Sequence, residues 1–351
     1  MGHPAARGHP RGREDRAILE EVRVLRLSLA CSDYDRTAAL RDGTVAPEGI
    51  ELVYLALPVE ETFYRMLRHR EFDVAEMSLS SYAVSLLAGD PWLVAIPVFP
   101  SRAFRHSGVF VHRGSGIERP EDLRGKVVGV AEYQLTANVW IRGILAEHHG
   151  VPVQAVSYRT AGLEQPERPE KLALDLPADV DLAPLGTGRS LSSALAAGEI
   201  DALYTPRAPS SFLAGDPAVD RLWPDAAAAE TAYFADTGIF PIMHVIVIRR
   251  ALHERHPWIA RSLFKAFTAA RDLAYERLRE TAALPYMLPF LPLDQERVVA
   301  AMGRDFWSYG LEPNRHVLQT FLRYHHEQGL SARRIAPEEL FVPEVLDAFA
   351  I

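Results

Sequence analysis

Two stretches of this chain share one pattern, and that internal repeat limits the folds it can adopt. Met66–Tyr82 (MLRHREFDVAEMSLSSY) and Ala194–Phe212 (ALAAGEIDALYTPRAPSSF) both read as the end of a helix, a tight turn, a short buried strand and a polar loop, with Asp73 matching Asp201. Each follows a segment that reads as a strand, a polar loop and a helix. Strands that alternate with helices favour a parallel or mixed sheet covered by helices. The repeat therefore predicts two similar α/β lobes.

The chain is predicted to cross between the lobes twice. The segment 244–248 (HVIVI) is apolar and β-branched, so we expect it to form a strand that returns to the first lobe. Helices are expected to dominate after it. The predicted division is a tail over 1–23, a first lobe over 24–108 and 240–351, and a second lobe over 109–239. At 351 residues the chain is long enough for two such domains.

Composition and charge argue against several other classes of protein. The net charge of −8 disfavours nucleic acid as a partner, because the phosphate backbone requires a basic surface. No apolar run approaches the roughly 18 residues of a membrane helix. The single cysteine, Cys31, excludes an intrachain disulfide and a cysteine zinc cluster. The first 23 residues lack the apolar core of a secretory signal, so we expect a cytoplasmic protein.

The loops at the carboxyl ends of the strands are the expected ligand site, because open α/β sheets bind ligands there. In this architecture those loops border the cleft between the lobes. They carry arginines, whose planar guanidinium matches a carboxylate. The candidate binding residues are Arg102, Arg207, Arg36, Arg142, Asp35, Glu76, Ser78, Ser80, Tyr133 and Thr136. Arg102 and Arg207 adjoin proline turns and are expected to hold a carboxylate, whereas Arg36 and Arg142 could instead be solvated or pair with Asp35 or Glu132.

Two histidines are the candidates for proton transfer, because imidazole titrates near neutral pH. His106 and His244 both adjoin loops of the expected cleft, and Glu132 begins the matching loop of the second lobe. We expect one of these histidines to be the general acid, with His244 favoured because it lies at a crossover, and Glu132 to accept a proton. If neither histidine is the acid, Glu76, Asp35 or Glu132 takes that role.

Known cofactor and metal motifs are missing from the sequence. It contains no G-x-G-x-x-G after a strand, no Walker A motif, no H-E-x-x-H and no G-x-S-x-G. A metal site made from Asp33, Asp35, Glu76, His106 and His244 is an alternative, but their spacing matches no metal motif. We therefore predict no metal and no organic cofactor.

A combination of segments carries a family resemblance. They are Asp33–Arg36, Pro58–Tyr82, Ala95–His106, Glu132–Tyr133, Trp140–Leu145, Gly198–Phe212, Thr237–His244, Phe306–Arg315 and Arg323–Leu330. Together they resemble the 4,5-dihydroxyphthalate decarboxylase family, over nearly the whole chain from Leu25 to Phe349. The resemblance implies a type 2 periplasmic-binding-protein-like fold, which that family shares with the solute receptors of transporters.

The resemblance also implies a reaction, in which 4,5-dihydroxyphthalate gives protocatechuate and CO2. That chemistry needs a general acid near the carbon that bears the leaving carboxylate, an acceptor near the para hydroxyl, and an anchor for the retained carboxylate. The expected partner is a small aromatic carboxylate, without nucleic acid or membrane, and a homo-oligomer is left open. Two alternatives remain: a non-catalytic solute-binding protein of the same fold, and an enzyme for another hydroxylated aromatic acid.

Overall fold

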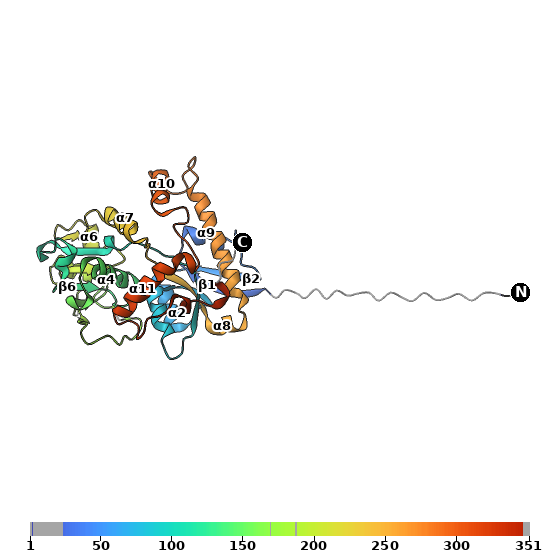
Figure 1. Ribbon diagram of the computed structural model, residues 1–351, viewed down its shortest axis with the longest axis horizontal. Coiled ribbons are helices and arrows are strands. Elements are labelled where there is room, and N and C mark those ends of the chain that lie inside the picture. The colour runs from blue at the N-terminus through green and yellow to red at the C-terminus, as the bar shows by residue number, and fades with distance from the viewer. Residues whose placement is uncertain (1, 3–23, 169, 187, 347–351) are drawn as a thin grey trace.

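The computed structural model describes residues 2, 24–168, 170–186 and 188–346, and all but one residue of the predicted tail lie outside these ranges. Two mixed sheets organise the described chain (Figure 1). The first has the order β2-β1-β3-β11-β4, with β1 Leu25–Cys31, β2 Ile50–Ala56, β3 Val74–Ser78, β4 Leu93–Ile96 and β11 His244–Arg249. The second has the order β10-β5-β9-β6-β7-β8, with β5 Val109–His112, β6 Val127–Val130, β7 Ser157–Thr160, β8 Leu182–Pro184, β9 Ala202–Tyr204 and β10 Val219–Arg221.

Helices cover both sheets and continue past the last strand. Their bounds are α1 Asp35–Arg41, α2 Val59–His69, α3 Leu79–Leu86, α4 Thr136–His149, α5 Leu191–Ala196, α6 Ser210–Leu213, α7 Ala226–Thr237, α8 Arg250–Arg255, α9 Trp258–Leu278, α10 Leu291–Met302 and α11 Arg315–Glu327. Within the described residues, no helix combines the length and the apolar content needed to cross a bilayer.

The return strand is confirmed. β11 lies between β3 and β4 and runs antiparallel to both, and its four central residues are fully buried. The strands of the first sheet thus come from 25–96 and 244–249, and those of the second from 109–221. The predicted lobe boundaries are compatible with this division of the strands and stay a prediction.

The internal repeat corresponds to two equivalent structural units. In the first, α2 leads into β3, and in the second α5 leads into β9. The aspartate of each turn bonds to the parallel neighbour of the strand that follows it: Asp73 accepts from the Ser28 amide of β1 at 3.0 Å, and Asp201 accepts from the Val127 amide of β6 at 2.8 Å. The repeated aspartate therefore satisfies a backbone donor that the sheet leaves unpaired.

The C-terminal helix α11 connects the lobes, because it packs against α4 of the second one. A Cβ atom at Gly143 would lie 2.0 Å from the ring of Tyr324, so glycine allows the two helices to approach closely. The hydroxyl of Tyr133 donates to the Gln328 carbonyl at 3.0 Å, and the indole of Trp140 donates to the Ile242 carbonyl at 2.9 Å. These buried contacts hold the lobes together along one side.

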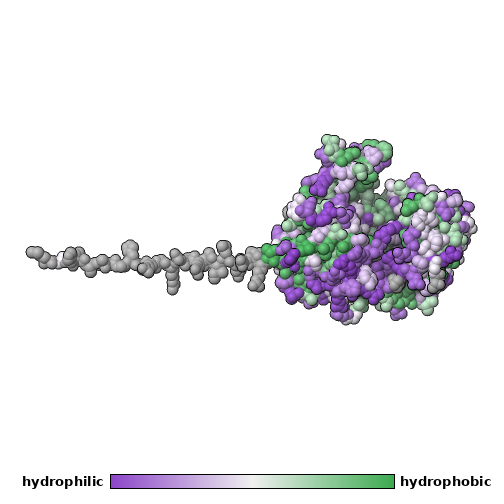
Figure 2. All heavy atoms as spheres, turned by 180° about the vertical axis from the view of Figure 1, so that it is seen from behind, coloured by the Kyte–Doolittle hydropathy of each residue, from purple (hydrophilic) through white to green (hydrophobic). Residues whose placement is uncertain are grey.

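An arm made of the end of α9, the following loop and α10 rises above the body of the molecule (Figure 1). Its exposed apolar side chains are Leu284, Met287, Leu288, Phe290 and Leu293. Figure 2 shows the arm as a projection with green, hydrophobic patches above a body on which purple and green areas are mixed.

Candidate functional site

A cavity of about 240 Å³ lies between the lobes. Its lining from the first lobe and the crossover is Tyr34, Val59, Glu60, Phe63, Ser78, Ser101, Arg105, Met243 and His244, and its lining from the second lobe is Leu135, Thr136, Ala137, Lys171, Pro206 and Arg207. Two helix starts meet there, because Ser78 caps α3 and Thr136 opens α4. Their hydroxyl oxygens lie 2.9 Å apart, and the Ser80 amide donates to Thr136 Oγ1 at 3.1 Å.

The cavity wall contains a histidine backed by a buried carboxylate. Glu76 lies on β3 and is 0% exposed, and its Oε1 is 2.6 Å from Nδ1 of His244 on β11. The antiparallel pairing of these two strands, with His244 opposite Ser78, brings the two side chains together. Since Nδ1 is occupied by Glu76, Nε2 is the nitrogen left for the cavity. Phe63 packs edge-on against the imidazole, with the ring centroids 5.0 Å apart.

Neutral donors surround the Glu76 carboxylate as well. The hydroxyl of Tyr34 donates at 2.7 Å, the Ser32 amide at 3.0 Å and the Cys31 thiol at 3.5 Å. Burial acts to raise the pKa of Glu76, but the charge of His244 and the hydrogen bonds from His244, Ser32 and Tyr34 outweigh it and hold the pKa below its usual value. Burial, and then the Glu76 charge, raise the pKa values of Tyr34 and Cys31, so both stay protonated as donors.

Three cations line the cavity, and they differ in their partners. Arg207 forms an ion pair with Glu60, in which Nη2 donates to Oε2 at 2.8 Å, and Lys171 forms an ion pair with Glu132. Arg105 is 9% exposed, and its Nε donates to the Met243 sulfur at 3.1 Å. In the part of the chain that the structure describes, Arg105 forms no ion pair with a carboxylate.

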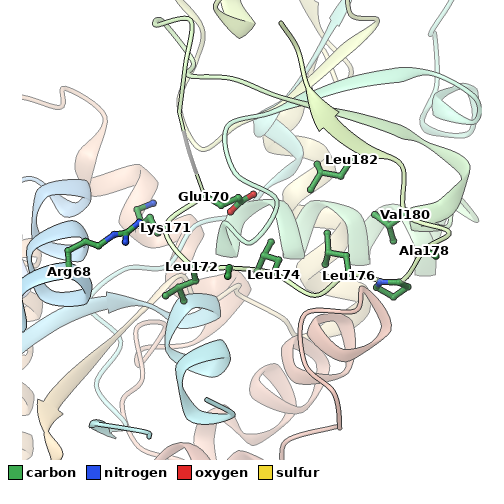
Figure 3. Close-up of a pocket in the computed structure, with 11 residues that line it drawn as sticks. Arg68, Glu170, Lys171, Leu172, Leu174, Leu176, Ala178, Val180 and Leu182 are labelled. Atoms are coloured by element: carbon green, nitrogen blue, oxygen red, sulfur yellow. The ribbon is translucent and has the colours of Figure 1, made fainter. Parts of the chain in front are cut away.

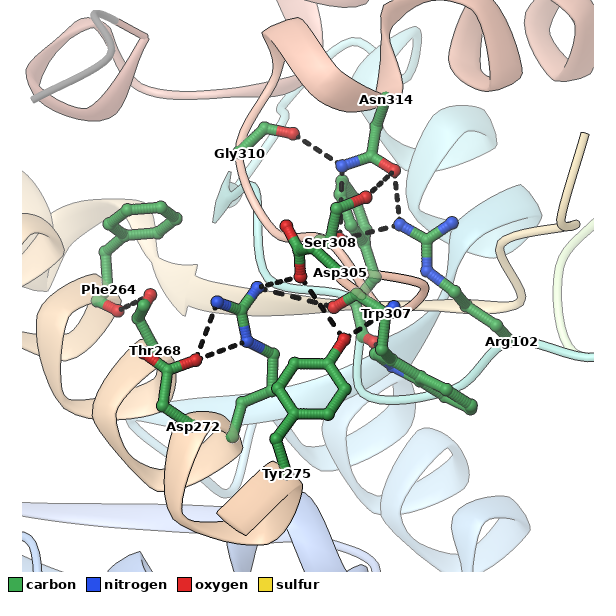
Figure 4. Close-up of polar contacts among 12 residues, drawn as sticks. Arg102, Phe264, Thr268, Asp272, Tyr275, Asp305, Trp307, Ser308, Gly310 and Asn314 are labelled. Carbon is green, nitrogen blue, oxygen red and sulfur yellow. Dashed lines mark hydrogen bonds and ion pairs between the residues drawn. The ribbon is translucent and has the colours of Figure 1, made fainter. Parts of the chain in front are cut away.

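The structure does not bring Arg102 to the cavity, although the sequence suggested it as an anchor. Figure 4 shows its guanidinium directed at Ser308 and Asn314. It donates to the Ser308 carbonyl at 2.7 Å, to the Phe240 carbonyl at 3.1 Å and to Asn314 Oδ1. Arg102 therefore fastens the C-terminal segment to the crossover, and these oxygen acceptors leave little of its hydrogen-bonding capacity for a ligand.

Arg36 and Arg142 are also engaged outside the cavity. Arg36 donates to the Pro100 carbonyl at 2.6 Å and to Asp35 at 3.0 Å, so the alternative that it pairs with Asp35 is confirmed. Its guanidinium lies 4.1 Å from the ring centroids of both Tyr34 and Trp307. Arg142 pairs with Gln328 rather than Glu132, at 2.7 Å, and its Nη2 donates to the Tyr133 carbonyl.

The remaining candidates lie in the walls behind the cavity. His106 packs against Trp223 and Tyr233, and burial, followed by the neighbouring His149 and His148, lowers its pKa to about 4. It is therefore neutral at pH 7 and does not line the cavity. Ser80 contacts Thr136 and His325, and the Tyr133 hydroxyl is bound to the Gln328 carbonyl.

Glu132 is 1% exposed, and its Oε1 accepts from Arg168 Nε at 2.7 Å and from Lys171. It lines an outer hollow of about 550 Å³, which shares Glu60, Lys171 and Arg207 with the cavity. These three side chains thus separate the cavity from the hollow, and Glu132 holds two cations of the segment beside it.

A larger groove of about 830 Å³ follows the segment between β7 and β8 (Figure 3). Leucines supply much of its lining, together with Arg68, Glu170 and Lys171. Burial raises the pKa of Glu170 to about 7, while its Oε1 accepts the Tyr133 amide. Glu170 does not line the cavity that contains His244, and neither Glu76 nor His244 lines the groove.

The cavity therefore combines predicted site residues with charged and phenolic side chains that were not among them. Ser78, Thr136, Arg207 and His244 line it, and Glu76 stands directly behind His244. The additional residues are Tyr34, Glu60, Arg105 and Lys171. Arg105 follows Arg102 by three residues, and no local signal separates them. Among the described residues, no three His, Cys, Asp or Glu side chains gather as a metal site would require.

Two curated proteins are similar to this chain in sequence. A 4,5-dihydroxyphthalate decarboxylase of Comamonas testosteroni is 45% identical over 327 residues, which cover 93% of this chain and 99% of that protein. A 4,5-dihydroxyphthalate decarboxylase of Pseudomonas putida is 44% identical over 210 residues, which cover 60% of this chain and 81% of that protein. No family model matches the chain.

Solved structures show what the fold is. A periplasmic sulfonate-binding protein of Methylobacillus flagellatus superposes with a TM-score of 0.53 at 15% identity, covering 92% of each chain. The aliphatic sulphonate-binding protein of Escherichia coli has a TM-score of 0.50 at 13% identity, covering 93% of this chain and 95% of that one. At such identities the likeness concerns the fold alone. It confirms the predicted two-lobed periplasmic-binding-protein-like α/β fold.

Proposed function

The chain belongs to the 4,5-dihydroxyphthalate decarboxylase family, and we propose that it converts 4,5-dihydroxyphthalate to protocatechuate and CO2 in the cavity between its lobes. It is thus a carboxy-lyase. The observation that carries the catalytic part of this proposal is the Glu76–His244 pair, with its 2.6 Å contact, in the wall of that cavity. We further propose that the reaction serves phthalate degradation in the cytoplasm.

The chemistry requires protonation of a ring carbon. In the substrate each carboxylate has a hydroxyl para to it. Protonated His244 donates from Nε2 to the carbon that bears the leaving carboxylate, and the para oxygen, on losing its proton, stabilises the positive charge on the ring. The bond to the carboxylate then breaks, its electron pair restores the aromatic ring, and CO2 leaves. The para oxygen regains a proton, so the net reaction consumes one proton and needs no oxidant or reductant.

The residues around His244 support this role in two ways. The pKa of Glu76 is held below its usual value, and its carboxylate orients the His244 ring through Nδ1. Tyr34 and Ser32 in turn fix the carboxylate, so little reorganisation is needed when the proton moves. His106, the other candidate acid, has a pKa of about 4 and carries no proton to donate at neutral pH.

The direct test is to incubate the purified protein with 4,5-dihydroxyphthalate and to follow CO2 and protocatechuate. We expect equal amounts of both products. His244→Gln should lower kcat by about 100- to 10,000-fold, the usual contribution of a general acid, in a variant that still folds. His69→Gln, at an exposed position at the end of α2, is the matched control and should keep full activity.

Two outcomes would contradict the proposal. If His244→Gln keeps most of its turnover, another group supplies the proton. If the wild-type protein binds the compound but releases no CO2, the chain is a solute-binding protein of the same fold.

A further inference from the structure

Three buried arginines of the described chain differ in how their guanidinium groups are satisfied. Arg102 and Arg142 donate to carbonyl and amide oxygens at 2.7 Å, as Figure 4 shows for Arg102. The hydrogen bond of Arg105 goes instead to the sulfur of Met243, and a thioether is a weak acceptor. Its two terminal nitrogens have no hydrogen-bond partner among the described residues, and the side chain lines the cavity.

Within the described ranges, no carboxylate forms an ion pair with Arg105. Glu230 is the group whose charge acts on it, but Glu230 already accepts from the Ser107 amide at 3.0 Å and from the Ser107 hydroxyl at 2.8 Å. Burial lowers the pKa of Arg105 to about 10, which still leaves it charged at neutral pH. A buried charge without a partner is costly, so a bound anion would be strongly favoured here.

The other cations of the cavity already have carboxylate partners. Arg207 is held by Glu60, and Lys171 by Glu132. Of the three cations that the described residues contribute to the lining, Arg105 is thus the one without a carboxylate partner. Its planar fork suits a carboxylate, which can accept two parallel hydrogen bonds.

We propose that Arg105 binds the carboxylate that the substrate retains, and thereby decides which end of the ring faces His244. This inference rests on the proposed function and deepens it. The product keeps that carboxylate, so Arg105 holds protocatechuate with a C–H group, not a carboxylate, toward His244. The retained carboxylate also has a hydroxyl para to it and could in principle be lost by the same chemistry. Because Arg105 binds this carboxylate away from His244, the reaction stops after one CO2.

The test is a binding measurement that does not depend on turnover. Titration calorimetry compares phthalate, which has two carboxylates and no hydroxyl, with catechol, which has two hydroxyls and no carboxylate. Loss of charged hydrogen bonds of roughly 1.5–3 kcal/mol corresponds to about 10- to 100-fold in affinity. Arg105→Gln should weaken phthalate binding by that factor and leave catechol binding unchanged. The control is Arg113→Gln. Arg113 forms an exposed ion pair with Asp220, so this variant should bind both compounds with wild-type affinity.

Stability separates a binding role from a structural one. Arg105→Gln removes an unpaired buried charge, so its unfolding temperature should equal or exceed that of the wild type, and phthalate should no longer raise it. Arg105→Lys keeps the charge but not the planar guanidinium, so it should bind phthalate with intermediate affinity. It replaces the glutamine variant in these measurements if that variant fails to fold.

Kinetics complete the test. Arg105→Gln should raise KM for 4,5-dihydroxyphthalate more than it lowers kcat, and should relieve inhibition by protocatechuate. Phthalate binding of wild-type strength in Arg105→Gln would overturn the assignment of Arg105. Failure of the wild-type protein to release CO2 would count against the proposed function alone, because the calorimetric comparison stands without it.

Discussion

Two buried carboxylates, one in each lobe, have opposite surroundings. Glu76 in the first lobe and Glu132 in the second are both no more than 1% exposed. Glu76 is held by a phenol, a thiol, a backbone amide and one imidazole. Glu132 is held by two cationic side chains, those of Arg168 and Lys171. A carboxylate beside a titratable base can support proton transfer, whereas one between two fixed cations serves to hold structure.

The difference follows from the position of each carboxylate in its sheet. Glu76 lies within β3, next to the crossover strand β11, which brings His244 beside it. Glu132 lies just beyond the end of β6, where the segment before β8 passes. Two predictions test this contrast directly, and two more extend it to the buried histidines and to an exposed ion pair.

Glu76→Gln should have the largest effect, on rate. The amide keeps the shape of the side chain but removes the carboxylate that holds Nδ1 of His244. We expect kcat to fall by about 100-fold or more, with little change in KM. Steady-state kinetics measure both constants. A kcat close to that of the wild type, together with a lowered unfolding temperature, would instead show that Glu76 is purely structural.

Glu132→Gln should act on stability. Removal of one partner from a buried ion pair leaves the other charge uncompensated, which costs about 3–5 kcal/mol of the free energy of unfolding. Urea denaturation measures this loss. Glu199→Gln, in an exposed pair with Arg189, should stay within about 0.5 kcal/mol of the wild type. A stable Glu132 variant with a kcat as low as that of Glu76→Gln would mean that both carboxylates take part in proton transfer.

Buried histidines should make the protein less stable at mildly acidic pH. Burial is the main cause that lowers the pKa of His106 to about 4 and of His325 to about 3, both from an ordinary value of 6.5. Their contribution to the free energy of unfolding is complete above pH 6.5. It is lost as the pH falls toward those values, because these histidines bind protons at a higher pH in the unfolded chain than in the folded one. The expected slope is up to about 1.4 kcal/mol per pH unit for each histidine. Denaturation at pH 7 to 5 measures it, and His106→Asn should reduce the slope.

The Glu60–Arg207 pair should give the smallest effect. Its side chains are 35% and 57% exposed, and an exposed pair contributes about 0.2–1 kcal/mol, which salt screens. A double-mutant cycle with Glu60→Gln and Arg207→Gln measures the coupling, and KM should change by less than about tenfold. A loss of phthalate affinity in Arg207→Gln as large as in Arg105→Gln would restore Arg207 as a carboxylate anchor, as the sequence predicted.

Much of the fold could be predicted because its signals are local. The helix-turn-strand repeat, the return strand at 244–248 and the cleft between lobes all follow from residue periodicity and from the rule for ligand sites in α/β sheets. The same rule selected His244, Ser78 and Thr136, because all three stand at the ends of strands or the starts of helices beside the cleft.

The anchor could not be chosen in this way. Arg102 and Arg105 belong to one loop and have similar sequence surroundings. Arg102 is held outside the cavity by a backbone β-bridge to Ile242 and by hydrogen bonds from its guanidinium to Ser308 and Asn314. These partners lie about 140 to 210 positions further along the chain. Arg105 remains in the cavity because it meets a methionine sulfur instead of such acceptors.

The sequence by itself thus determined the two-lobed α/β fold and pointed to the edge at which we propose that a ligand binds, since burial periodicity along a segment specifies helix, strand and face. Only the tertiary structure decided which charged side chains form structural contacts and which lie at the cavity. That choice depends on partners far apart in the chain: β11 beside β3 for Glu76, Arg168 and Lys171 beside Glu132, and the C-terminal segment beside Arg102.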